Sequence, residues 1–256
     1  MDYTFPVCIE GIKTETGLSV PGKKALVRTD TSKVLCLVSD KIRQIKTHKE
    51  TVEEAEKLFS GFGPYKIQVF LSKGDLIVRV VGIFKDIITV LANGVEIQKL
   101  LMVEHTYETI DMHPTVYVGG FIKKSNTWFV NPTPVTKLIA GSEDVYWSNL
   151  ADNRINKRWE QAISKWGCWD SCCISYERAV AMIRSGIPGI LTQEKNPYVI
   201  KRLKTNVDDD VSIWDLYYTI ARAILSEEFS SIGTKLKKIK ELSNYIDKKF
   251  HTIKEV

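Results

Sequence analysis

The sequence has no apolar run of the roughly 20 residues that a helix needs to cross a bilayer. Its first residues, MDYTFPVCIEGIK, also lack the basic flank and long apolar stretch of a secretory signal peptide. These two absences exclude the usual patterns of a membrane-spanning or secreted chain. We therefore expect a soluble, cytoplasmic protein that does not associate with a membrane.

Cysteine and histidine are both scarce. The chain has five cysteines in 256 residues. This number is odd and too small for a disulfide framework, so we expect reduced and mostly buried thiols. Cys168, Cys172 and Cys173 lie close together, but they fall in a helical stripe, whereas zinc ligands usually come from tight turns. We interpret them as small apolar residues and expect neither a metal nor another cofactor.

Phosphate-binding loops are also missing. The chain contains neither G-x-x-x-x-G-K-[ST] nor G-x-G-x-x-G, which argues against a P-loop nucleotide hydrolase. Its four histidines form no H-E-x-x-H pair. His105 with Glu104, Glu108 and Asp111 is the one local cluster of acids and bases, and surface charge explains it better than catalysis does. We assign no catalytic residue, and an enzyme that uses the His105 region ranks third among the alternatives.

Residues 25–59 carry the clearest structural pattern in the chain. Apolar residues on both sides of the polar run 29–32 predict a β-hairpin. Thr47, with Glu50 three residues later, predicts a capping box at the start of a helix. We expect Gly61-Phe62-Gly63 to end that helix, because glycine tolerates the left-handed conformation.

The remainder of the first half is strand-rich, and the second half changes to a helical period. Apolar positions from Ile155 to Ile183 step by four and three, which predicts one helix, or two if Gly167 interrupts it. Asp152 or Asn153 is the expected start of this segment. Further helices are expected from a capping pair at Ser212 and from Thr234 onward. Short apolar or alternating runs separated by turn residues predict strands over 65–71, 76–84, 87–91, 95–103, 115–122 and 127–130.

These patterns predict an α+β fold. We expect a single domain over residues 1–256, with a strand-rich part and one helix over 1–135 and a helical part over 150–256. A mainly antiparallel sheet from the first part would pack against helices from the second. The hydrophobic content of 44% is sufficient for such a core.

Basic and aromatic residues occur together in the second half. The net charge is +5, and most of the excess of Lys and Arg lies after residue 150. Trp159, Trp166 and Trp169 share a segment with several cations, and exposed rings can stack on unpaired bases while cations contact phosphates. Tryptophans at this spacing also suit a core or a helix interface. The residues expected to bind nucleic acid are Arg154, Lys157, Arg158, Lys165, Lys195, Lys201, Arg202 and Lys204, with Tyr198 in the looped stretch around the last four.

The hairpin region resembles the phage/plasmid-like protein family (domain of unknown function 932). Arg28-Thr29-Asp30 followed by the strand Leu35–Asp40 is similar to the family's arginine-threonine-aspartate hairpin and the leucine-x-valine-valine-x-aspartate strand after it. Ser212–Tyr217 is similar to a tryptophan-x-leucine-tyrosine segment near the family's C-terminal end. The chain departs from the family at 105–109 and at 117–121. The resemblance implies a viral, prophage or plasmid origin, with the host cytoplasm as the location, and it carries over no catalytic residue.

Two function classes follow. The leading expectation is a non-enzymatic, phage-type protein that contacts nucleic acid, as a single-stranded DNA binder in replication or recombination would. The alternative is a protein-interaction component, either part of a virion or a factor acting on a host protein. In that alternative the tryptophan-rich helix forms an interface with a protein partner or a second copy of the chain.

Overall fold

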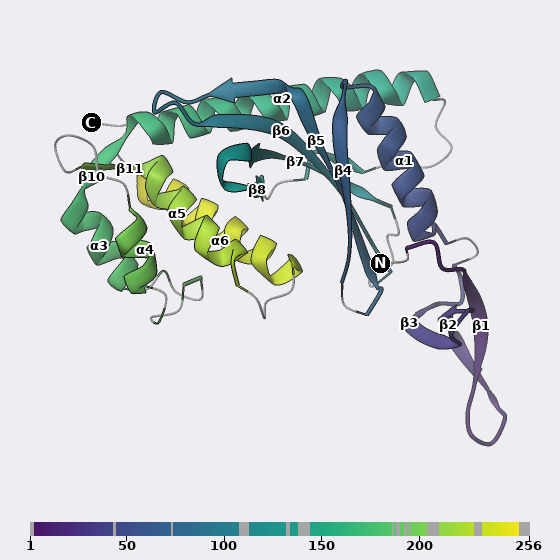
Figure 1. The fold of residues 1–256 in the computed structure, drawn as a ribbon. Helices are drawn as coiled ribbons and strands as arrows, with labels where there is room; N and C mark the ends of the chain where they lie inside the picture. The colour runs from purple at the N-terminus through teal and green to yellow at the C-terminus, as the bar shows by residue number, and fades with distance from the viewer. Residues whose placement is uncertain are drawn as a thin grey trace. The chain divides into compact units, whose positions relative to one another are not determined.

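The fold is known from a computed structural model, which describes most of the chain. For 137, 144–151 and 232 it describes the backbone alone. The described residues are 3–42, 45–72, 74–107, 113–131, 134–137, 144–185, 187, 190–191, 194, 196–203, 210–227 and 232–250. Antiparallel sheets fill the first half and helices the second, which confirms the predicted α+β class (Figure 1).

The chain divides into two compact units that alternate along the sequence. Unit 1 comprises Met1–Phe84, Leu101–Tyr117 and Pro134–Asp152, and unit 2 comprises Lys85–Leu100, Val118–Thr133 and Asn153–Val256. Central strands contribute residues to both units, so neither unit is a single stretch of sequence. The expected single domain over residues 1–256 stays a prediction.

Unit 1 begins with a three-stranded antiparallel sheet. Its strands, in spatial order, are β1 (Val7–Lys13), β2 (Ser19–Arg28) and β3 (Lys33–Ser39). The hairpin of β2 and β3 confirms the predicted one, and Ser32 takes a positive φ of 53° in its turn. Strand β1 was not predicted. Leu26, Leu35 and Val38 form a core cluster with Phe5 and Tyr107, so one side of this small sheet is buried.

Helix α1 (His48–Ser60) follows and begins as predicted. Thr47 and Glu50 form the complete capping box. The run 61–63 ends the helix, as predicted. Gly61 caps it in the right-handed conformation, with φ −68°, and Gly63 takes the positive φ of 104°.

The strands β4 to β9 belong to a six-stranded antiparallel sheet. Neighbouring strands are consecutive in sequence from β4 to β8, and β9 pairs with β7. The predicted strands 76–84 and 87–91 form one long strand, since the intervening Lys85 and Asp86 continue the extended backbone. The strands are β4 (Tyr65–Ser72), β5 (Ile77–Val90), β6 (Glu96–Thr106), β7 (Thr115–Ile122), β8 (Thr127–Val130) and β9 (Thr136–Lys137), with the short helix η1 (Lys123–Ser125) before β8.

Within unit 1, α1 packs closely on the start of β5. A Cβ atom at Gly82 would lie 2.7 Å from the ring of Phe59, so only glycine leaves room for that buried ring. Phe59 also meets Phe84 edge-to-face, with ring centroids 6.0 Å apart. This contact fixes α1 against the strand that follows the turn at Asp75.

The helices of the second half end at different points from those predicted. The stripe from Ile155 to Ile183 spans two helices, and the break lies after Ser171 and not at Gly167. The first of these helices starts at Asp144, well before Asp152. The stretch around Tyr198, which was expected to be a loop, is a helix. The elements are α2 (Asp144–Ser171), β10 (Cys173–Ser175), α3 (Tyr176–Arg184), α4 (Asn196–Arg202), β11 (Asp210–Ser212), α5 (Ile213–Leu225) and α6 (Ile232–Phe250).

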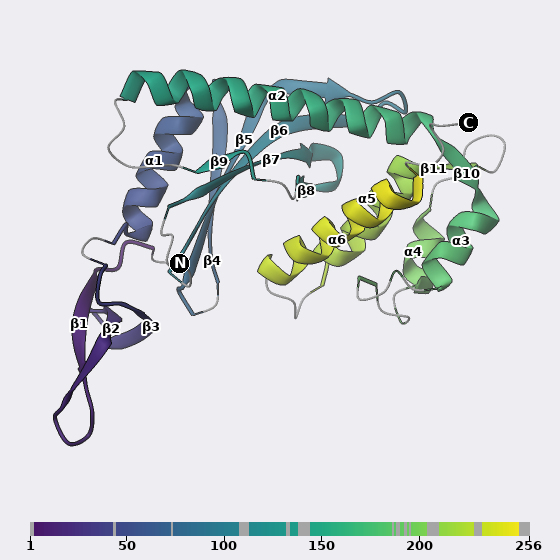
Figure 2. The same ribbon diagram turned by 180° about the vertical axis from the view of Figure 1, so that it is seen from behind.

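Unit 2 has an aromatic core. Helices α5 and α6 lie side by side (Figure 2), and both contact β8. Trp166 meets Phe129 of β8 edge-to-face at 4.8 Å between ring centroids, and Trp214 of α5 lies within 5.9 Å of Trp166. Trp159 and Trp169 are each only 6% exposed. The tryptophan stripe therefore belongs mainly to the core, although Trp169 also lines a pocket.

Candidate functional site

The structure places the predicted cations in different surroundings. Arg154 and Lys157 are exposed on α2, and Lys201 and Arg202 are exposed on α4. The guanidinium of Arg158 donates to Gln161 Oε1 at 3.1 Å. Lys195 and Lys204 lie outside the described residues.

Lys165 has a structural partner and is not available to a phosphate. Its ammonium donates to Ser243 Oγ at 3.0 Å and to the carboxylate of Asp247, both on α6. It also lies 4.6 Å from the centroid of the Trp169 ring. Because a carboxylate already neutralises this cation, Lys165 leaves the set of residues that we expect to contact nucleic acid.

A second group of cations surrounds a pocket of about 360 Å³ in unit 2. We call it the basic pocket. It combines three cations with two aromatic side chains, and no Asp or Glu is among the described residues that line it. They are Ser125, Asn126, Thr127, Trp128, Tyr198, Arg202, Arg222, Leu225, Ser226 and Lys235.

Helix α4 supplies the exposed aromatic ring of the basic pocket. Tyr198 and Arg202 are one helical turn apart, so both side chains lie on the same side of α4. The Arg202 guanidinium carbon is 3.9 Å from the centroid of the Tyr198 ring, a cation–π contact that orients both groups. Tyr198 is nevertheless 44% exposed. A large ring that accessible, held beside a cation, is a suitable platform for an unpaired base.

The other two cations lie at the end of α5. Arg222 is exposed in its last turn. The Lys235 ammonium donates to the Leu225 carbonyl at 2.8 Å, which satisfies one of the last carbonyls of that helix. Cations are favoured at this position because the helix dipole is negative here. The nearby carboxylate of Glu227 is bound to Lys238 at 2.9 Å and does not neutralise the pocket.

Sequence reasoning found Arg202 and Tyr198 but missed Arg222, Lys235 and Trp128. The three missed residues come from α5, α6 and β8, which are far apart along the chain. No periodic pattern connects them, because each lies on the polar side of a different element. Among the described residues, neither Arg202 nor Arg222 has a carboxylate partner, so their charges are available to a ligand.

The histidine cluster in unit 1 is buried, contrary to the surface-charge interpretation of His105. His48 and His105 are 2% and 1% exposed, and their Nδ1 atoms are 3.2 Å apart. His48 Nε2 donates to the Asp75 carbonyl at 2.8 Å, and the His48 ring stacks on Tyr107. Burial lowers the pKa of His48 to about 4, and the Asp75 carbonyl and carboxylate only partly oppose it.

This cluster is structural in its geometry. Both rings are almost fully covered, so a substrate has no access to their nitrogens. Glu104 does not accompany His105 as an acid, since its carboxylate pairs with Arg79 at 2.6 Å. Glu108 and Asp111 lie outside the described residues. The arrangement gives no support to the enzyme alternative.

The thiols are less buried than the sequence suggested. Cys8, Cys36, Cys168 and Cys172 are half-buried and Cys173 is exposed, so the expectation of mostly buried cysteines is wrong. Within the described ranges, no three His, Cys, Asp or Glu side chains are grouped so as to hold a metal ion. No described helix combines the length and apolar character required to span a membrane.

Comparison with known proteins adds no assignment. No protein-family model matches the chain. No curated protein and no solved structure matches it either. The resemblance to phage/plasmid-like proteins therefore stays a prediction, and the function must be argued from the residues themselves.

Proposed function

We propose that this protein binds single-stranded nucleic acid through the basic pocket. Arg202, Arg222 and Lys235 would contact backbone phosphates, and an unpaired base would stack on Tyr198. The observation that carries the proposal is the set of three cations around one pocket, with no carboxylate among its described lining residues, next to an exposed aromatic ring. This combination of charge and ring surface is typical of proteins that bind single strands with little sequence preference.

The preference for a single strand has a physical reason. In a duplex both faces of each base are covered by neighbouring bases, whereas an unpaired base can leave the stack and lie against an aromatic ring. Tyr198 is the accessible ring of the pocket, and Trp128 on its wall is half-buried. A duplex would gain the phosphate contacts alone.

The proposed ligand is the single-stranded nucleic acid expected from the sequence, but its site is the basic pocket and not the surface of α2. On the predicted surface of α2, Lys165 is paired with Asp247 and the tryptophans are buried in the core. Arg202 and Lys201 on α4 remain, and Arg222 and Lys235 join them. The protein-interaction alternative depended on an exposed tryptophan stripe, and burial of that stripe removes its supporting observation.

A fluorescence anisotropy titration tests this function. Labelled oligothymidine is titrated with the wild type, Arg202→Gln and Arg222→Gln at several salt concentrations. Each substitution should weaken binding and lower the slope of log K against log salt by about 1, because each removes one phosphate contact. Lys240→Gln is the matched control, since Lys240 is an exposed cation of α6 outside the pocket.

Two results would contradict the proposal. One is an affinity for oligothymidine that does not change with salt. The other is an equal loss of affinity in Lys240→Gln and in the pocket variants, because binding would then follow the total charge of the protein. Arg154→Gln and Lys157→Gln show in the same assay whether the exposed cations of α2 take part.

A further inference from the structure

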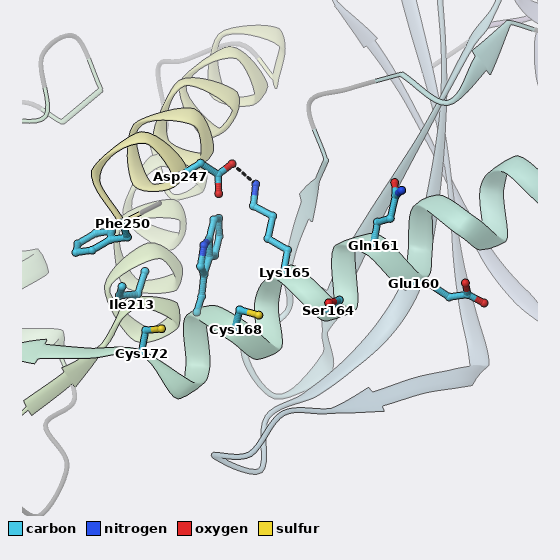
Figure 3. A pocket seen from close by; sticks show the side chains of 10 residues that line it. Glu160, Gln161, Ser164, Lys165, Cys168, Cys172, Ile213, Asp247 and Phe250 are labelled. Atoms are coloured by element: carbon cyan, nitrogen blue, oxygen red, sulfur yellow. Dashed lines mark hydrogen bonds and ion pairs between the residues drawn. The ribbon is translucent and has the colours of Figure 1, made fainter. Parts of the chain in front are cut away.

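A larger pocket of about 610 Å³ lies along one side of α2 in unit 2. We call it the ion-pair pocket, because the ion pair of Lys165 with Asp247 forms part of its wall (Figure 3). It shares no lining residue with the basic pocket. Its volume falls within the range of small-molecule binding sites, roughly 300 to 1,000 Å³.

The walls of this pocket are of two kinds. Trp169, Ile213 and Phe250 supply an apolar surface, and the half-buried thiols of Cys168 and Cys172 extend it. Lys165 and Asp247 supply opposite charges. Apolar walls with a few placed polar groups are the usual composition of a site for a small molecule.

Both charges are fixed in position and remain accessible. The side chain of Lys165 is 29% exposed and that of Asp247 is 36% exposed. Ser243 accepts a second hydrogen bond from the Lys165 ammonium, and the Trp169 ring lies beside it. A ligand therefore meets a preorganised pair of charges and not two mobile side chains, which lowers the entropic cost of binding.

The ion pair restricts the charge of a suitable ligand. An anion that binds Lys165 leaves the Asp247 carboxylate without its partner. A cation that binds Asp247 likewise leaves the Lys165 ammonium without its partner. Breaking a partly buried ion pair in this way is unfavourable. A ligand with both charges gives each side chain a new opposite charge, so neither loses its partner.

We propose that the ion-pair pocket binds a zwitterion with an apolar side chain, such as a free aromatic amino acid. The carboxylate of the ligand contacts the Lys165 ammonium, its ammonium contacts the Asp247 carboxylate, and its side chain lies against Trp169, Ile213 and Phe250. This inference is independent of nucleic-acid binding, because the two pockets use different residues. Glu160 lines the same pocket outside the ion pair and provides a control.

Four ligands that share the phenylethyl group of phenylalanine differ in charge and so separate the alternatives. Calorimetry compares L-phenylalanine, which is zwitterionic, with hydrocinnamate, phenethylamine and the neutral N-acetyl-phenylalanine amide. L-Phenylalanine should bind at least about tenfold more tightly than each of the other three, since each of them leaves one or both protein charges unmatched. Equal binding of hydrocinnamate or of phenethylamine, or no binding of any of the four, would overturn the proposal.

Variants of the pair test the role of each charge. Lys165→Met should shift the preference to phenethylamine, and Asp247→Asn should shift it to hydrocinnamate, because each variant leaves one charge in the pocket. Loss of a merely structural contact would weaken all ligands alike, and that result would also refute the assignment. Glu160→Gln should bind L-phenylalanine as the wild type does. Circular dichroism checks the fold of each variant. The double variant K165D/D247K retains an ion pair, so it should keep the preference for the zwitterion.

Discussion

The buried histidine pair makes the stability of unit 1 sensitive to pH in a predictable direction. His48 is neutral in the folded protein because burial opposes its charged form, and its pKa is lowered from 6.5 to about 4. In an unfolded chain the same side chain binds a proton near its ordinary pKa of about 6.5. Between these two values the unfolded state binds more protons, so acid favours unfolding.

The magnitude follows from the two pKa values. At 1.36 kcal/mol for each pKa unit, the lowering to about 4 corresponds to roughly 3 kcal/mol. The folded state has its full stability above about pH 6.5 and loses this amount as the pH falls to about 4. The groups that face His48 are the rings of Phe5, His105 and Tyr107 and the Asp75 carbonyl. The Asp75 carboxylate raises the pKa of His48, but by less than burial lowers it.

Urea unfolding at a series of pH values measures the effect. Carboxylates titrate over part of the same range, so the informative quantity is the difference between the wild type and His48→Gln. The variant should lose about 3 kcal/mol less than the wild type between pH 6.5 and pH 4. His113→Gln is the matched control, because His113 is exposed and should leave the pH dependence unchanged. The reasoning is refuted if His48→Gln has the pH dependence of the wild type, or if His113→Gln flattens it equally.

Two further predictions concern the basic pocket and the packing of α1. Tyr198→Ala should weaken the binding of oligothymidine by about 1 to 3 kcal/mol through the loss of stacking, while Tyr198→Phe should retain it, as anisotropy would show. Binding that is equally weak in both variants would exclude stacking. Gly82→Ala should lower the free energy of unfolding by about 1 to 3 kcal/mol in urea, because its Cβ would lie 2.7 Å from the Phe59 ring. Gly11→Ala, where a Cβ meets nothing within 4 Å, should change it little.

Local sequence patterns predicted the parts of the fold that local interactions determine. The hairpin of β2 and β3 and the capping box of Thr47 with Glu50 each involve residues close in sequence. Ser212 caps α5 through the Asp215 amide in the same way. Each of these signals is complete within a few residues, so it could be recognised before the structure was known.

Contacts between distant residues could not be predicted in this way. His48 lies at the start of α1 and His105 belongs to a strand 57 positions later, yet their rings are in contact. The break between α2 and α3 depends on the pairing of β10 with β11, where Ile174 lies opposite Val211. A helical stripe continues through that break because both helices bury the same kind of residue. The apolar pattern therefore marked most of the buried positions, but it failed at the exposed Cys173 and at the ends of the helices.

Lys165 and Arg202 show most directly why a binding site requires the structure. Each lies one helical turn from an aromatic residue and makes a cation–π contact with it, at 4.6 Å to Trp169 and at 3.9 Å to Tyr198. By sequence the two pairs are equivalent. Asp247 neutralises Lys165 from 82 positions away, whereas no described carboxylate pairs with Arg202. Under the proposed function, Arg202 therefore contacts a phosphate and Lys165 does not. We expect Arg202→Gln to lower the salt dependence of oligothymidine binding and Lys165→Met to leave it unchanged.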